Sequence, residues 1–203
     1  MFNFEDFLAR AKSRLLSEPE QKADRTDDDL NANARLIPEN GRLTAAAVLV
    51  PIVMRDEARV LLTQRHGALS KHAGQIAFPG GRVDDDETIR DAALREAQEE
   101  IGLPPEITAF LGYLPSYLTV TQYLVSPVVA LVQPPFELSL QRGEVDEAFE
   151  VPLAFLMDPQ NCQRHSREWK GQQRFYYVYE YGPRYIWGAT AGMIRSLHDQ
   201  LYA

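Results

Sequence analysis

Three glutamates near the middle of the chain are spaced as metal ligands on a helix would be. Glu96, Glu99 and Glu100 occupy positions i, i+3 and i+4, which share one face of an α-helix. Carboxylates so close together repel one another unless positive charge lies among them. Such hard oxygen ligands suit Mg²⁺ or Mn²⁺, usually together with phosphate oxygens. The spacing indicates a metal and phosphate site, and a solvated acidic helix face is the alternative.

The neighbouring residues define the helix that must carry these glutamates. Acidic residues precede it, where negative charge suits a helix N-terminus, and Thr88 or Asp86 can cap it. Gly102 should end it, because prolines at positions 104 and 105 forbid its continuation. An apolar stripe on the helix can pack on a sheet, and its members are Ala93, Leu94, Ala97 and Ile101.

The segment before the helix supplies positive charge and glycines. A diphosphate needs positive charge on both sides of its bridging oxygen, and a metal ion covers only one side. Basic side chains lie in a loop that leads into the helix, and glycines permit an anion to approach the backbone. An ordinary basic, glycine-rich loop is the alternative. We therefore expect five residues to contact the substrate: Arg65, Lys71, His72, Gly80 and Gly81.

Residues 81–103 resemble the Nudix box. Every polar position of that box is filled at its spacing, and only Ala97 stands where a larger aliphatic residue is preferred. The resemblance implies an α/β fold, namely an α/β/α sandwich with a mixed sheet. It implies hydrolysis of a nucleoside diphosphate linked to another group. It also implies a divalent cation bound by Glu96, Glu99 and Glu100, support from Glu87, and an Arg95 that orients a glutamate.

Residues 61–81 resemble the signature of the coenzyme A pyrophosphatase branch of that family. LLTxR at residues 61–65, Gly74 and FPGG at residues 78–81 match it, and residues 185–197 resemble the C-terminal end of the branch. The branch implies cleavage of coenzyme A or its derivatives to 3′,5′-ADP and 4′-phosphopantetheine. Two positions depart from the signature: His66 occupies a position where the signature has Ser or Ala, and Ser70 occupies a position where it has arginine. Lys71 can replace that arginine only as a point charge, which leaves NADH or an ADP-sugar open as the substrate.

A general base is also required, because water must lose a proton as it attacks phosphorus. Glu99 is one candidate, and Glu144 is another because related enzymes carry an acid on a loop in this region. A solvated loop acid is the alternative for Glu144. A third interpretation is a Nudix-fold module that binds nucleotides without hydrolysis. Such a module would lack box carboxylates, and none is missing here.

The remaining pattern predicts a helix and a polar arm at residues 1–43, followed by a Nudix domain at residues 44–203. Apolar residues recur at helical spacing from Phe4 to Leu15. This helix is expected to pack on protein, either on the domain or on a partner subunit, so a homodimer is possible. Strands are expected at residues 44–53, 59–63, 107–114, 124–132, 175–181 and 185–188, and helices from residue 151 and at residues 190–201.

Composition limits the partners. The net charge of the 203 residues is −8, which argues against a broad nucleic-acid surface. Cys162 is the single cysteine, so a reducing, cytoplasmic location is expected. The sequence shows neither a secretory leader nor a membrane-spanning run. The expected partner is therefore a small nucleoside diphosphate rather than nucleic acid or a membrane.

Overall fold

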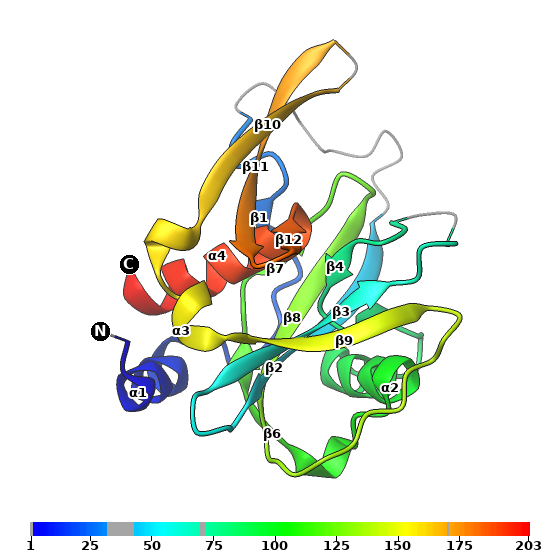
Figure 1. The fold of residues 1–203 in the computed structure, drawn as a ribbon, viewed down its shortest axis with the longest axis vertical. Coiled ribbons are helices and arrows are strands. Elements are labelled where there is room, and N and C mark those ends of the chain that lie inside the picture. Colours follow the sequence, from blue (N-terminus) through cyan, green and yellow to red (C-terminus); the bar gives the residue numbers. More distant parts are fainter. Residues whose placement is uncertain (1, 32–42, 70–71, 170) are drawn as a thin grey trace.

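A mixed β-sheet forms the centre of the computed structural model, which describes residues 2–31, 43–69, 72–169 and 171–203 (Figure 1). Within these ranges nine strands join in it, in the order β1-β7-β8-β2-β3-β4, while β5 pairs with β2, β6 with β8 and β9 with β3. The strands are β1 (Ala23–Thr26), β2 (Thr44–Val53), β3 (Arg59–Arg65), β4 (Ile76–Ala77), β5 (Gly80–Arg82), β6 (Thr108–Tyr113), β7 (Ser116–Leu118), β8 (Tyr123–Val132) and β9 (Val145–Pro152).

Helices cover both faces of this sheet. Helix α2 (Ile89–Ile101) lies on one face, while α1 (Phe4–Arg14), α3 (Leu153–Leu156) and α4 (Ala189–Tyr202) pack on the other. Strand β2 is apolar along its length because it faces both layers. Leu49 packs in the core under α2, whereas Val50 packs in the core that includes α1 and α4. The predicted α/β/α sandwich and its mixed sheet are confirmed, since β2 is parallel to β8 and antiparallel to β3.

The chain also forms a second, smaller sheet. Strands β10 (Gln163–Trp169), β11 (Gln172–Tyr181) and β12 (Arg184–Trp187) form it, and β10 and β11 project as a long hairpin at the top of Figure 1. Arg184 ties it to the main sheet by donating to Gln64 Oε1 (3.0 Å) and Glu147 Oε2 (2.6 Å). Strand β10 was not predicted, because its sequence QRHSREW is polar and lacks an apolar alternation.

The N-terminal helix packs within its own chain. Phe7 and Ala11 are fully buried in the core that includes α4. Arg10 donates to the carbonyl oxygen of Leu201 (3.2 Å) and lies over the ring of Tyr202. The expected packing of this helix on protein is therefore confirmed. Within the described ranges, no helix combines the length and the apolarity that crossing a membrane requires.

The polar arm contains an unpredicted strand and is fixed to the domain. Strand β1 runs parallel to β7. Asp27 accepts hydrogen bonds from the Tyr117 hydroxyl (2.9 Å) and the Val120 N–H (2.8 Å). The side chain of Asn31 donates to the carbonyl oxygen of Phe175 (2.9 Å) and accepts from its N–H (2.8 Å). These contacts hold the segment up to Asn31 against both sheets.

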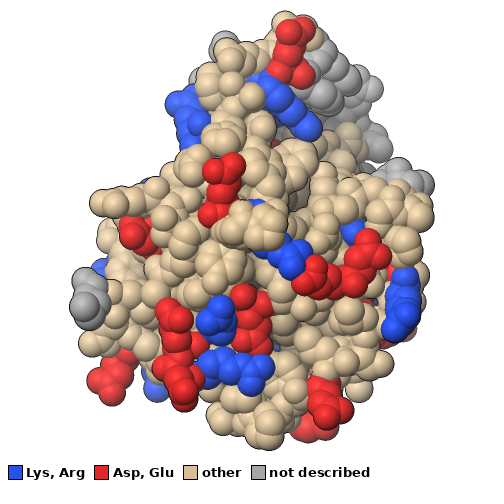
Figure 2. Space-filling model, in the orientation of Figure 1, with Lys and Arg blue, Asp and Glu red and all other residues tan. Residues whose placement is uncertain are grey.

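Acidic and basic side chains are interspersed on the face drawn in Figure 2. The ion pairs of the domain include Arg184 of β12 with Glu147 of β9, and Arg55 of the turn after β2 with Glu150 of β9. Exposed pairs of this kind contribute little to stability, typically about 0–1 kcal/mol each. The two apolar cores, rather than these surface pairs, therefore stabilise the sandwich.

Replacing Asp27 with alanine tests how firmly the arm is held. The hydroxyl of Tyr117 and the N–H of Val120 would lose their acceptor, so the free energy of unfolding should fall by about 1–3 kcal/mol in urea titrations. Asp27→Asn retains one acceptor oxygen and should lose less. Asp24→Ala, at an exposed position of the same arm, is the control. Equal losses for Asp27→Ala and Asp24→Ala would show that the hydrogen bonds to Asp27 do not stabilise the fold.

Candidate active site

Helix α2 begins and ends where the sequence predicts. The Thr88 side chain caps it by accepting a hydrogen bond from the Asp91 N–H (3.1 Å). Gly102 ends it in the left-handed conformation, with φ of 68°. Ala93, Ala97 and Ile101 are buried against the sheet. This packing directs Glu96, Glu99 and Glu100 to the sides of the helix next to its buried face, near β5.

Arg95 joins three of the predicted site carboxylates. Its Nε and Nη2 donate to the two oxygens of Glu87 (3.0 and 2.8 Å), and this bidentate pair is a strong geometry. Its Nη1 lies 3.0 Å from Glu96 Oε1 and 3.1 Å from Glu99 Oε2. The hydrogen bonds from Arg95 lower the pKa of Glu87. The sequence indicated only that Arg95 orients a glutamate, and the structure adds contacts to all three.

Glu100 differs from the other glutamates because it is buried. Only 4% of its surface is exposed, whereas the Glu99 side chain is 56% exposed. Glu100 Oε2 accepts a hydrogen bond from the Gly80 N–H (3.2 Å), and Oε1 lies 3.7 Å from Arg65 Nη1. Burial raises the pKa of Glu100 to about 7, against the opposing effects of the Gly80 N–H and Arg65. Its negative charge is thus only partly compensated.

The glycine pair before the box makes room for these carboxylates. A Cβ on Gly81 would lie 2.5 Å from the carboxylate oxygens of Glu96, and one on Gly80 would lie 2.3 Å from the Ala47 carbonyl oxygen. The sequence suggested that these glycines let an anion approach the backbone. In the structure the anions beside them are the side chains of Glu96 and Glu100.

Glu144 lies on a loop that meets the same carboxylates. Burial is the largest cause of the raised pKa values of Glu96 and Glu100, and the charge of Glu144 contributes to both. The Glu144 carbonyl oxygen accepts from the His66 N–H (2.8 Å), at the start of the basic loop. The structure therefore brings Arg65, at the end of β3, and Glu144, on the loop before β9, to the carboxylate cluster.

Two other residues were predicted to contact the substrate. Lys71 lies outside the described residues, as does Ser70. His72 is exposed, and its ring Nδ1 lies 2.8 Å from Gln75 Oε1. Arg65 is thus the basic residue of this loop for which the structure gives a contact with a box glutamate.

The residues fit a divalent cation by ligand type and by charge. Their side chains supply carboxylate oxygens, which Mg²⁺ and similar hard ions prefer. Within the described residues, the one cationic group paired with the buried Glu100 carboxylate is the Arg65 guanidinium, at 3.7 Å. Within the same ranges, however, no three Asp, Glu, His or Cys side chains stand ready as a chelating group. Arg95 lies among Glu87, Glu96 and Glu99, so binding of a cation requires these side chains to rearrange.

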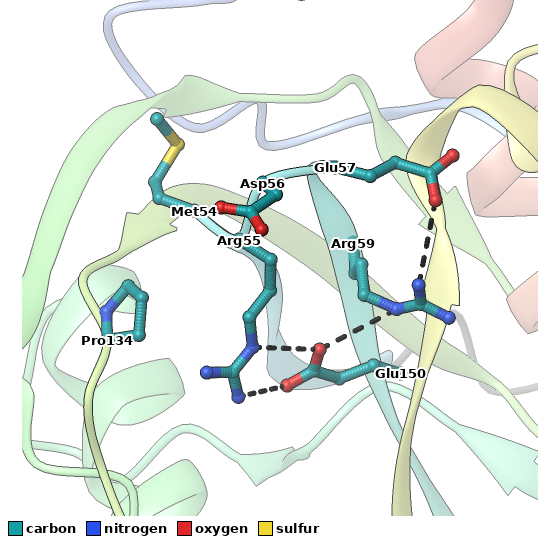
Figure 3. A pocket seen from close by; sticks show the side chains of 7 residues that line it. All are labelled: Met54, Arg55, Asp56, Glu57, Arg59, Pro134 and Glu150. Atoms are coloured by element: carbon teal, nitrogen blue, oxygen red, sulfur yellow. Dashed lines mark hydrogen bonds and ion pairs between the residues drawn. The ribbon is translucent and has the colours of Figure 1, made fainter.

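A hollow at the turn between β2 and β3 is a separate feature (Figure 3). Arg55 and Arg59 line it, and both form ion pairs with Glu150 (2.7 and 3.7 Å). Arg59 and Arg65 are the first and last residues of β3, so the hollow lies roughly 20 Å along the strand from the cluster. Its arginines are paired with acids, and it shares no residue with the site.

Comparisons with known proteins identify the family of this chain. The NUDIX domain model matches residues 43–175. A Klebsiella pneumoniae protein named as an uncharacterized Nudix hydrolase, NudL, is 42% identical over 187 residues, covering 87% of this chain and 95% of that protein. A Cronobacter sakazakii protein of the same name is 44% identical over 165 residues, covering 77% and 82%.

A solved structure has the same fold. The MutT/nudix family protein from Enterococcus faecalis has a TM-score of 0.52 at 19% identity, over 80% of this chain and 63% of that one. At this identity the similarity concerns the fold alone. The matched domain and the relatives, which align over most of both chains, establish that this protein belongs to the Nudix hydrolase family, whose enzymes cleave diphosphate bonds with a divalent cation.

Proposed function

We propose that the protein is a Mg²⁺- or Mn²⁺-dependent hydrolase that cleaves the diphosphate of coenzyme A or its derivatives. The supporting observation is the 3.7 Å approach of Arg65 to Glu100. Arg65 ends the LLTxR segment that resembles the coenzyme A branch, and Glu100 belongs to the Nudix box. The segment that indicates the substrate thus meets a carboxylate proposed to bind the cation. The products would be 3′,5′-ADP and a 4′-phosphopantetheine species.

Each side chain of the cluster has a role in this proposal. Glu96, Glu99 and Glu100 would hold the cation with support from Glu87, and the cation would neutralise phosphate charge and acidify a bound water. Arg65 would place a second positive charge on the diphosphate. Orientation and electrostatics, without a covalent intermediate, would account for the rate.

Glu144 would accept the proton of the attacking water. It is partly buried and adjoins Glu96 and Glu100 without contacting Arg95 in any described hydrogen bond. Glu99 is the alternative base, but it is bound to Arg95 and would be shared with the cation. A carboxylate outside the cation's ligand set is freer to take a proton.

A second candidate keeps the chemistry and changes the substrate to another nucleoside diphosphate derivative, such as NADH or an ADP-sugar. Ser70 favours it, because it replaces the arginine of the coenzyme A signature. An arginine can grip a phosphate with two parallel hydrogen bonds, which a serine cannot do. A binding module without activity has no support, since all the box carboxylates are present.

A substrate screen distinguishes these candidates. The purified protein would be incubated with coenzyme A, acyl-coenzyme A, NADH and ADP-sugars in Mg²⁺ or Mn²⁺, and the products identified by mass spectrometry. Coenzyme A compounds should give the highest kcat/KM, and Ser70→Arg should raise that value about tenfold through one added phosphate contact. Preferential cleavage of NADH or an ADP-sugar, unchanged by Ser70→Arg, would establish the second candidate instead.

Glu100→Gln tests the assigned cation site. The amide keeps the shape and still accepts from Gly80, but it lacks the charge, so kcat should fall about 10²-fold or more. Glu106→Gln, at an exposed position just beyond the helix, should retain full activity. Equal activity of the two variants would remove Glu100 from the site.

The same variant should change stability in the opposite direction. Glu100 holds its proton more tightly when folded, because burial raises its pKa from 4.5 to about 7. Its contribution to stability is therefore present below about pH 4.5 and is lost as pH rises towards 7. With a chelator present at pH 8, the free energy of unfolding of Glu100→Gln should exceed that of the wild type by about 1–3 kcal/mol. This difference should vanish near pH 4.5. If Glu100→Gln were less stable than the wild type at pH 8, the claim that the Glu100 charge is only partly compensated would be wrong.

A further inference from the structure

The loop before β9 is attached to the C-terminal end of α2. The last carbonyl groups of a helix lack hydrogen-bond donors within the helix. Here the loop supplies donors to two of these carbonyl groups. The Ser139 N–H donates to the Ile101 carbonyl oxygen (2.9 Å), and the Gln141 N–H donates to that of Glu100 (2.9 Å). A Cβ on Gly102 would lie 2.9 Å from the Ser139 nitrogen. Residue 141 is therefore anchored to the residue whose carboxylate is buried in the site.

Gln141 also contacts Glu144 through both its backbone and its side chain. Its carbonyl oxygen accepts from the N–H groups of Glu144 (2.9 Å) and Val145 (3.0 Å). Its side-chain Nε2 donates to Glu144 Oε1 (3.3 Å). On the far side, the Glu144 carbonyl oxygen is fixed by the His66 N–H. Glu144 is thus held between the C-terminal end of α2 and the start of the basic loop.

We propose that Gln141 is a positioning residue for hydrolysis, which holds the Glu144 carboxylate towards Glu96 and Glu100. This inference rests on the proposed function, in which Glu144 accepts the proton of the attacking water. An amide suits the task because it is neutral. It fixes the direction of the carboxylate, whereas a Lys or Arg in its place would stabilise the ionised form and weaken Glu144 as a base.

A double-mutant cycle tests this role. Gln141→Met keeps the side-chain length and the backbone hydrogen bonds but removes the amide donor. One exposed hydrogen bond from a neutral amide to the Glu144 carboxylate is lost, so kcat should fall roughly three- to tenfold while KM stays nearly constant. In a Glu144→Gln background the same change should have almost no effect, because the two residues act as a unit. Gln160→Met, an exposed glutamine beyond α3, is the matched control and should retain full activity.

The outcomes separate this inference from the proposed function. Equal losses from Gln141→Met in both backgrounds, or no loss in either, would overturn the positioning role while leaving the hydrolase intact. A Glu144→Gln variant with wild-type kcat would remove both Glu144 as base and Gln141 as its positioning residue. A wild-type protein that cleaves none of the screened diphosphates would overturn the proposed function, and this inference with it.

Discussion

The crowding of negative charge at one end of α2 is the constraint on which the rest of the site depends. Glu99 and Glu100 lie in the last turn of the helix, where the helix dipole disfavours anions, and no basic residue lies in that turn. Arg95 offsets part of this charge by bonding Glu87, Glu96 and Glu99. Among the residues that the structure describes, Glu100 receives one backbone N–H and one more distant guanidinium. Such an arrangement is unfavourable for folding alone and suits a protein that binds a cation there.

The surrounding structure keeps these carboxylates together. The buried face of α2 fixes the helix on the sheet through small residues such as Ala93 and Ala97. Strand β5 lies beside the carboxylates because Gly80 and Gly81 carry no side chain. The Glu144 loop is attached to the helix end across Gly102, whose lack of a Cβ allows this close approach. Three glycines therefore set how closely the helix, β5 and the loop converge.

Local features of the site could be predicted from the sequence, because short-range signals determine them. The Thr88 cap and the Gly102 stop bound α2 as expected, and the apolar run at residues 44–53 forms β2. The burial of Glu100 could not be predicted. Glu96 and Glu100 are one helical turn apart, and the residues that contact the Glu100 carboxylate, Gly80 of β5 and Arg65 of β3, come from elements outside the helix.

Long-range contacts account for the other unpredicted features. The sequence predicted only a polar arm before residue 44, yet Asp27 in this arm bonds Tyr117, which lies 90 residues away in sequence. Gln141 carried no signal, because an isolated glutamine in a polar loop has many ordinary explanations. Its proposed role depends on its contact with the Glu100 carbonyl group, and only the folded structure brings these two residues together.

The central claim is that the α2 carboxylates exist to bind a divalent cation, and locating bound Mn²⁺ by anomalous diffraction tests it most directly. Crystals containing Mn²⁺ should show the ion among the carboxylate oxygens of Glu96, Glu99 and Glu100, with Arg95 displaced from at least one of them. An empty cluster at Mn²⁺ concentrations that support turnover, with Arg95 still bonded to all three of its partners, would contradict the account.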